Sequence, residues 1–143
     1  MSFNVLIVDD SAAMRAVIKK IVSISGFKMT HCFEAGNGLE ALGQLKCNWV
    51  DVIISDINMP EMNGLELLKA LQQDPLYETI PVIVVSTEGS RERIEEAQRM
   101  GARGFIKKPF LPEEIRHVLH DVIGVGNDGE YQSDQGNADE CDF

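Results

Sequence analysis

The sequence predicts an α/β fold in which a doubly wound, five-stranded parallel sheet is covered by five helices. Short apolar runs rich in Val and Ile, typical of strands buried on both faces, alternate with segments whose apolar residues recur every three or four positions, typical of helices. Turn and capping residues separate these segments. The 143 residues are enough for one hydrophobic core, and right-handed crossovers would place helices on both faces of the sheet.

The first predicted strand and helix occupy residues 5–26. Residues 5–8 are a continuous apolar run, and the Asp-Asp-Ser sequence at 9–11 ends this strand and can cap a helix. Gly26 ends the helix. The apolar positions that recur along it, and are expected to face the core, are Met14, Val17, Ile18, Ile21 and Val22. The basic residues expected on its other side are Arg15, Lys19 and Lys20.

The middle of the chain predicts two further strands and two further helices. Residues 28–33 form a weaker strand, and the helix after it is marked by Leu39, Leu42 and Leu45. Residues 50–55 form the third strand, which Asp56 closes. Met59-Pro60 and Asn63-Gly64 are turn signals. They precede a third helix, whose apolar positions are Leu65, Leu68 and Leu71.

The last third of the fold repeats the cycle twice. Pro81 opens a strand at 82–85, and Ser90 caps a helix whose inward residues are Ile94, Ala97 and Met100. Residues 104–106 form a short last strand. The final helix begins at 111–114, and its apolar positions are Ile115, Val118, Leu119 and Val122.

Composition changes at the end of the last predicted helix. We expect one folded domain over residues 1–124, followed by an acidic, disordered tail or linker over residues 125–143. This tail contains six acidic residues and no Lys or Arg. Such a composition buries too little apolar surface to offset the entropy of ordering the chain.

Charge and cysteine content restrict the classes of function. The chain has 13 Lys and Arg against 23 Asp and Glu, a net charge of −10, which disfavours binding to nucleic acid or to an anionic membrane. No apolar run approaches the roughly 20 residues needed to span a bilayer. The three cysteines have no metal-ligand spacing and form an odd set, which favours a reduced, cytoplasmic location.

Polar residues follow the predicted strands where each one ends. Asp9 and Asp10 follow the first strand, Asp56 the third, Ser86 the fourth and Lys108 the fifth. In an open parallel sheet these ends share one edge, where ligands bind. Crowded carboxylates need a cation, and Mg²⁺ (or Mn²⁺) prefers oxygen ligands. The adjacent lysine indicates a second, anionic ligand such as a phosphoryl group, which one of the aspartates could accept covalently.

Four segments of the sequence resemble a known family. Residues 5–11 (VLIVDDS), 56–64 (DINMPEMNG), 81–88 (PVIVVSTE) and 104–110 (GFIKKPF) are similar to receiver domains of two-component response regulators, especially the CheY-like chemotaxis type. The resemblance runs over residues 4–123. It implies a flavodoxin-like sheet with strand order 2-1-3-4-5, and it identifies residues 1–124 as the receiver domain.

The resemblance implies a role for each residue at this edge of the sheet. Asp56 would be the phospho-acceptor, and Asp9, Asp10 and Asp56 would hold Mg²⁺ with the backbone carbonyl of Asn58. Ser86 and Lys108 would contact the phosphoryl group.

Further roles follow from the same resemblance. Ser86 and Phe105 would switch position on phosphorylation, and Asn58 and Glu88 would tune the lifetime of the aspartyl phosphate. Pro109 would follow a cis peptide bond.

We therefore expect a signalling module that takes a phosphoryl group from a sensor histidine kinase and changes its surface for a downstream effector. It would catalyse only its own phosphotransfer and autodephosphorylation, with a phosphatase as a further partner, and would be a monomer or a phosphorylation-dependent dimer. We expect a stand-alone CheY-like regulator. The alternatives are a receiver fragment of a longer response regulator and a haloacid-dehalogenase-type Mg²⁺-dependent phosphatase, although adjacent Asp9-Asp10 departs from the D-x-D spacing of those enzymes.

Overall fold

The computed structural model describes residues 3–87 and 89–123, in which strands and helices alternate. Glu88 and the predicted tail at 125–143 lie outside these residues. The elements in chain order are β1 (Phe3–Val8), α1 (Ala12–Ile24), β2 (Met29–Ala35), α2 (Gly38–Cys47), β3 (Val52–Asp56), α3 (Gly64–Gln72), β4 (Val82–Ser86), α4 (Arg91–Arg99), β5 (Gly104–Lys107) and α5 (Pro112–Ile123).

The five strands form one parallel sheet in the order β2-β1-β3-β4-β5. The predicted fold class and strand order are thus confirmed. The chain leaves β1 toward one edge of the sheet to form β2 and then returns past β1 to form β3. The carboxyl ends of β1 and β3 therefore border the point where strand order reverses, which is where open parallel sheets bind ligands.

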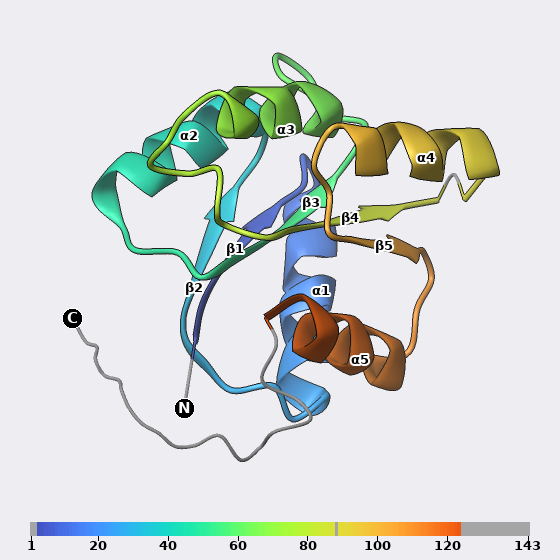
Figure 1. The fold of residues 1–143 in the computed structure, drawn as a ribbon. Helices are drawn as coiled ribbons and strands as arrows, with labels where there is room; N and C mark the ends of the chain where they lie inside the picture. Colours follow the sequence, from blue (N-terminus) through green and yellow to red (C-terminus); the bar gives the residue numbers. More distant parts are fainter. Residues whose placement is uncertain (1–2, 88, 124–143) are drawn as a thin grey trace.

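Helices cover both faces of the sheet (Figure 1). Helices α1 and α5 lie on one face, and α2, α3 and α4 lie on the other. Because strand side chains alternate between faces, Val5 and Ile7 pack in the core beneath α1 and α5, whereas Leu6 and Val8 pack in the core beneath α2, α3 and α4. Residues 5–8 are all fully buried, as expected for a central parallel strand.

Local sequence sets most helix ends. Ser11, Asn37, Asn63 and Ser90 each accept a hydrogen bond at a helix N-terminus. Asn63 and Glu66 complete a capping box at the start of α3. Gly26 adopts a positive φ of 93° just after α1, so the predicted stop is confirmed.

Three expectations need correction. Val17 was expected to face the core, but it is 47% exposed, because the next residue, Ile18, fills the space against the sheet. The second strand runs to Ala35 rather than residue 33, since β1 continues to pair with it. The third strand begins at Val52 rather than residue 50.

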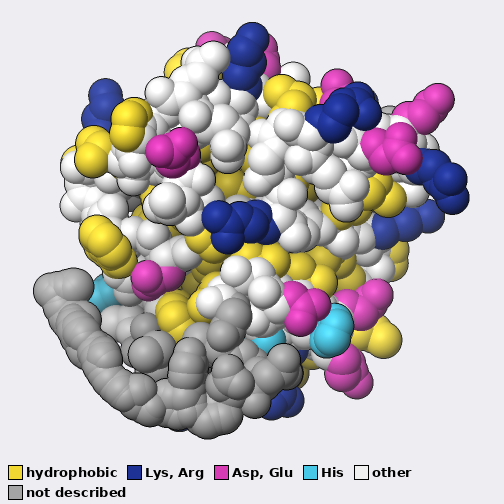
Figure 2. All heavy atoms as spheres, in the orientation of Figure 1, with side chains coloured by type: hydrophobic (Ala, Val, Ile, Leu, Met, Phe, Trp, Pro, Cys, Tyr) yellow, Lys and Arg dark blue, Asp and Glu magenta, His cyan; other side chains and the backbone are white. Residues whose placement is uncertain are grey.

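The surface carries charged side chains of both signs. On the face in Figure 2, charges of both signs are interspersed over α4. Trp49, the chain's single tryptophan, is 72% exposed just before β3.

Over residues 3–87 and 89–123, no helix has the length and apolar character needed to cross a membrane.

Candidate phosphorylation and metal site

Three carboxylates meet at the carboxyl ends of β1 and β3. Asp9 and Asp10 follow β1, Asp56 ends β3, and Val8 is paired in register with Ser55, which places the two strand ends side by side. One carboxylate oxygen from each aspartate lies within 4.8 Å of the others. Asp9 is buried, Asp56 is half-buried and Asp10 is exposed. The cluster is therefore open to solvent on the Asp10 side.

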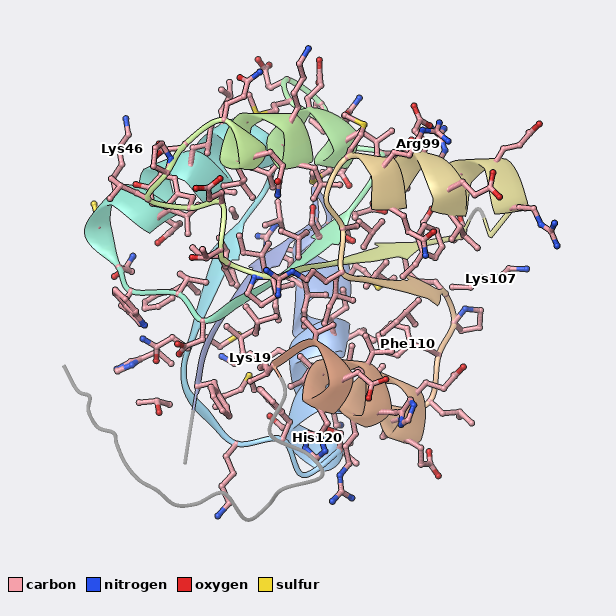
Figure 3. The ribbon with its side chains drawn as sticks, in the orientation of Figure 1. Lys19, Lys46, Arg99, Lys107, Phe110 and His120 are labelled. Atoms are coloured by element: carbon pink, nitrogen blue, oxygen red, sulfur yellow. The ribbon has the colours of Figure 1, made fainter. Side chains whose placement is uncertain are left out.

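The lysine that follows β5 reaches the same cluster. Lys108 Nζ lies 3.4 Å from Asp9 Oδ2 and 3.7 Å from Asp56 Oδ1, and its side chain is only 12% exposed. Its backbone N–H donates to Ser86 O at 2.8 Å, and the Lys108–Pro109 peptide bond is cis. The neighbouring Lys107, in contrast, is exposed and points away from the fold (Figure 3).

The charge state of Asp56 reflects this environment. Burial raises the pKa of Asp56 above its ordinary value, and the nearby Lys108 opposes the rise. Repulsion from Asp9 raises the pKa further, whereas the Ile57 N–H, which donates to Asp56 Oδ1 at 2.8 Å, lowers it. The net direction is upward, so ionising Asp56 in the folded chain carries an energetic cost that a bound cation would remove.

The donor set fits a hard divalent cation. Three carboxylates face one ammonium group, which leaves an excess of two negative charges in a half-buried site. Oxygen-only ligands with one side open to water are the set that Mg²⁺ or Mn²⁺ prefers. Asp9 is already oriented, because its Oδ1 accepts from the Ser11 N–H at 2.9 Å.

The other predicted site residues that the structure describes differ in burial. Ser86 is fully buried at the end of β4, and Asn58 is exposed two residues after Asp56. Phe105 is half-buried on β5, paired in register with Val84, and it packs against the core beneath α2, α3 and α4. Glu88 lies outside the described residues.

Sequence reasoning missed two residues of the site. Arg15, expected on the solvent side of α1, has a side chain only 18% exposed, and its Nη1 donates to the Asp9 carbonyl at 2.6 Å. That expectation was wrong, because the Arg15 side chain donates hydrogen bonds to two acceptors at the strand ends, the Asp9 carbonyl and the Glu34 carboxylate. Gly64 appeared only as a turn signal, yet its N–H donates to Ile57 O at 2.8 Å and a Cβ there would collide with the Asp56 carbonyl.

Comparisons with known proteins show which family the chain belongs to. The family model described as response regulator receiver domain matches residues 5–120. A CheY homologue of Campylobacter jejuni, described as a chemotaxis protein, is 42% identical over 125 residues, which covers 87% of this chain and 95% of the relative. These matches do not favour the phosphatase alternative.

Solved structures of similar proteins have the same fold. The chemotaxis response regulator CheY4 of Vibrio cholerae is 36% identical, has a TM-score of 0.75 and covers 85% of this chain and 99% of its own. CheY from Borrelia burgdorferi, solved in a complex with CheX, BeF₃ and Mg²⁺, is 30% identical with a TM-score of 0.74, over 84% of this chain and 88% of that one. The chain therefore belongs to the response regulator receiver domain family, as a CheY-like member.

Proposed function

We propose that this protein is a phosphorylation-controlled signalling module of the chemotaxis type, which accepts a phosphoryl group on Asp56 in a reaction that depends on Mg²⁺. The observation that supports the proposal best is the convergence of Asp9, Asp10 and Asp56, with Lys108 in reach of two of them. A binding surface for protein partners, rather than turnover of a diffusible substrate, is the output.

The nucleophile in this proposal is the Asp56 carboxylate. Its Oδ1 accepts from the Ile57 N–H and lies 3.7 Å from Lys108 Nζ, which holds the carboxylate in place and leaves Oδ2 to attack phosphorus. The new Oδ2–P bond forms as the P–N bond of a kinase phosphohistidine breaks, and the imidazole leaves with the bonding electron pair. The Lys108 ammonium group then stabilises the negative charge on an equatorial oxygen of the phosphoryl group.

Asp9, Asp10, Asp56 and the Asn58 carbonyl are the proposed holders of the divalent cation. When bound, the cation supplies positive charge for the oxygens of the transferring group. The chain's own contribution is preorganisation, since Lys108 and the Ile57 N–H already contact Asp56 before any donor arrives.

The conformational response is proposed to run through Ser86 and Phe105. Ser86, buried at the end of β4, would bond the new phosphoryl oxygens, and the half-buried Phe105 would turn inward and remodel the surface around β5. Asn58 and Glu88 are the proposed residues that set the rate of autodephosphorylation.

The proposed partners are a sensor histidine kinase, a downstream effector and a phosphatase, with the chain acting as a monomer or a phosphorylation-dependent dimer. Nucleic acid and membrane are not proposed as partners. The complex of the Borrelia burgdorferi CheY with CheX supports protein partnership for a relative of this fold. The proposed location is the cytoplasm, where thiols such as those of Cys32 and Cys47 stay reduced.

The domain proposal keeps residues 1–124 as the receiver and 125–143 as a tail or linker. Two uses of this receiver stay open, a stand-alone regulator and a receiver within a longer response regulator. A stop codon immediately after the Phe143 codon of the native gene would favour the stand-alone regulator, and a continuing reading frame would favour the longer protein.

Radiolabelled acetyl phosphate tests the proposed acceptor. The wild-type chain with Mg²⁺ should take up one acid-stable, base-labile label per chain, and excess EDTA should prevent uptake. The Asp56→Asn variant should take up none. Asp51→Asn is a matched control, because Asp51 is a half-buried carboxylate just before the same strand. Equal labelling of the Asp56→Asn variant would place the acceptor elsewhere, and continuous release of phosphate would favour a phosphatase.

A further inference from the structure

We propose that Arg15 and Glu34 form a clamp that positions the acidic pair Asp9-Asp10 for cation binding. The inference rests on the proposed function, because it takes the cation site at the ends of β1 and β3 as given. Arg15 is a positioning residue in this proposal, since it acts on the site through the backbone of Asp9 and touches neither phosphorus nor the attacking oxygen.

The Arg15 guanidinium joins two strand ends to α1. Its Nη1 donates to the Asp9 carbonyl at 2.6 Å, and its Nε donates to Glu34 Oε1 at 2.8 Å. Glu34 lies on β2 beside the end of β1. A planar guanidinium can hold two acceptors at once with fixed geometry, which a lysine ammonium on a flexible stem does less well. The clamp therefore sets the position of one strand end relative to the other.

The held carbonyl belongs to the peptide unit that joins Asp9 to Asp10. Because a peptide unit is planar, fixing this carbonyl also orients the backbone N–H of Asp10. On the other side of Asp10, the Ser11 N–H donates to Asp9 Oδ1 at 2.9 Å. The Asp9 N–H donates to Ala35 O at 3.0 Å, which adds a second link to β2. The backbone around the exposed Asp10 is thus held on both sides.

If the clamp is lost, electrostatics and positioning predict opposite changes in the affinity for Mg²⁺. Removing Arg15 removes a positive charge beside a cation site, and Coulomb's law alone then predicts tighter binding of Mg²⁺. Loss of positioning predicts weaker binding, because the carboxylates must be reordered when the ion enters. The direction of the change in Kd therefore separates the two effects.

The test is isothermal titration of the metal-free full chain with MgCl₂, for the wild type and for Arg15→Met. The clamp predicts that Kd for Mg²⁺ rises about tenfold in the variant, the size typical of lost outer-shell contacts. Lys19→Met is the matched control, because it removes a positive charge from the exposed side of the same helix. Its Kd should stay unchanged or fall slightly.

A double-mutant cycle tests whether Glu34 acts on the cation site through Arg15. Glu34→Ala should weaken Mg²⁺ binding in the wild-type background and have a smaller effect in the Arg15→Met background, where only the loss of the Glu34 negative charge remains. Glu34→Gln keeps an acceptor for Nε and should bind Mg²⁺ more tightly than Glu34→Ala. If Arg15→Met lowers the melting temperature of the metal-free chain below the assay range, Arg15→Lys replaces it, with weaker binding again expected.

The outcomes separate failure of the clamp from failure of the proposed function. Wild-type affinity, or tighter binding, in the folded Arg15→Met variant overturns the clamp and leaves the cation site in place. Additive effects of Arg15→Met and Glu34→Ala overturn the coupling between them. A wild-type chain that binds no Mg²⁺ overturns the proposed function itself.

Discussion

Replacing Asp56 by asparagine should stabilise the metal-free protein at neutral pH. The substitution keeps the size and one acceptor oxygen of the side chain but removes its charge. Because the pKa of Asp56 is raised in the folded chain, ionisation at neutral pH disfavours folding, and the neutral amide avoids this cost. Loss of function and gain of stability are thus expected from one change.

The size of the gain follows from the charges around Asp56 and from its burial. A carboxylate oxygen of Asp9 lies within 4.8 Å, so repulsion costs at least about 3.5 kcal/mol at an effective dielectric constant of about 20. Lys108 Nζ at 3.7 Å contributes about 4.5 kcal/mol of attraction on the same scale. These two terms nearly cancel. Burial, the largest cause, then decides the sign: it disfavours the charge, and the Ile57 N–H hydrogen bond offsets it only in part. We expect a net gain of about 1–2 kcal/mol.

Thermal unfolding in EDTA, followed by circular dichroism, measures this gain. At pH 7 the Asp56→Asn variant should melt about 4–8 °C above the wild type. Between the ordinary pKa of 3.8 and the raised pKa of the folded chain, the folded wild type binds more protons than the unfolded chain, so its stability falls as pH rises. The difference between variant and wild type should therefore vanish below pH 3.8, grow as pH rises toward the raised pKa of folded Asp56, and stay constant above it.

Magnesium should shift this comparison in favour of the wild type. At ten times Kd the ion adds about 1.4 kcal/mol to a chain that binds it, and the variant, with one carboxylate fewer, should gain less. A variant less stable than the wild type at pH 7 in EDTA would mean that attraction to Lys108 outweighs burial and repulsion, and the reasoning on the sign of the charge effect would be wrong.

Four other substitutions test three separate parts of the structure. Gly64→Ala should cost about 1–3 kcal/mol and slow acetyl phosphate labelling, because the new Cβ collides with the Asp56 carbonyl; an unchanged melting temperature and rate would contradict this. Lys108→Met should tighten Mg²⁺ binding in a titration while slowing labelling about 100-fold, and weaker Mg²⁺ binding would contradict the charge argument. In urea unfolding, Leu68→Ala, at a fully buried position, should cost about 2–5 kcal/mol, and Leu39→Ala, at a 52% exposed position, less than about 1 kcal/mol; equal losses would contradict the assigned core.

Periodicity and strand-end positions predicted most of the fold and the centre of the site. Residues 5–8 and 82–85 read as buried strands because nearly every side chain is apolar, and topology then brings Asp9, Asp10 and Asp56 to one edge. Strand pairing adds residues at the boundaries, such as Ala35, that composition alone assigns to a loop.

Contacts made by backbone atoms could not be predicted in the same way. Arg15 reads as a solvent-facing residue by helical spacing, and its two acceptors, the Asp9 carbonyl and the Glu34 carboxylate, come from different strands. Gly64 reads as a turn residue, and its close approach to the Asp56 carbonyl depends on where α3 begins relative to β3. Both features depend on backbone positions that residue types do not encode directly.

The location of Trp49 has a practical consequence for spectroscopy. The indole precedes β3, whereas Asp56 ends this strand, so the length of the five-residue strand, roughly 15 Å, lies between them. Its Nε1–H donates to Asp51 Oδ1 at 3.1 Å, at the amino end of the sheet. Intrinsic tryptophan emission of this protein therefore reports global unfolding and quencher access at the edge of the sheet opposite the cation site. We expect it to be insensitive to cation binding, which calorimetry or an introduced fluorophore would measure instead.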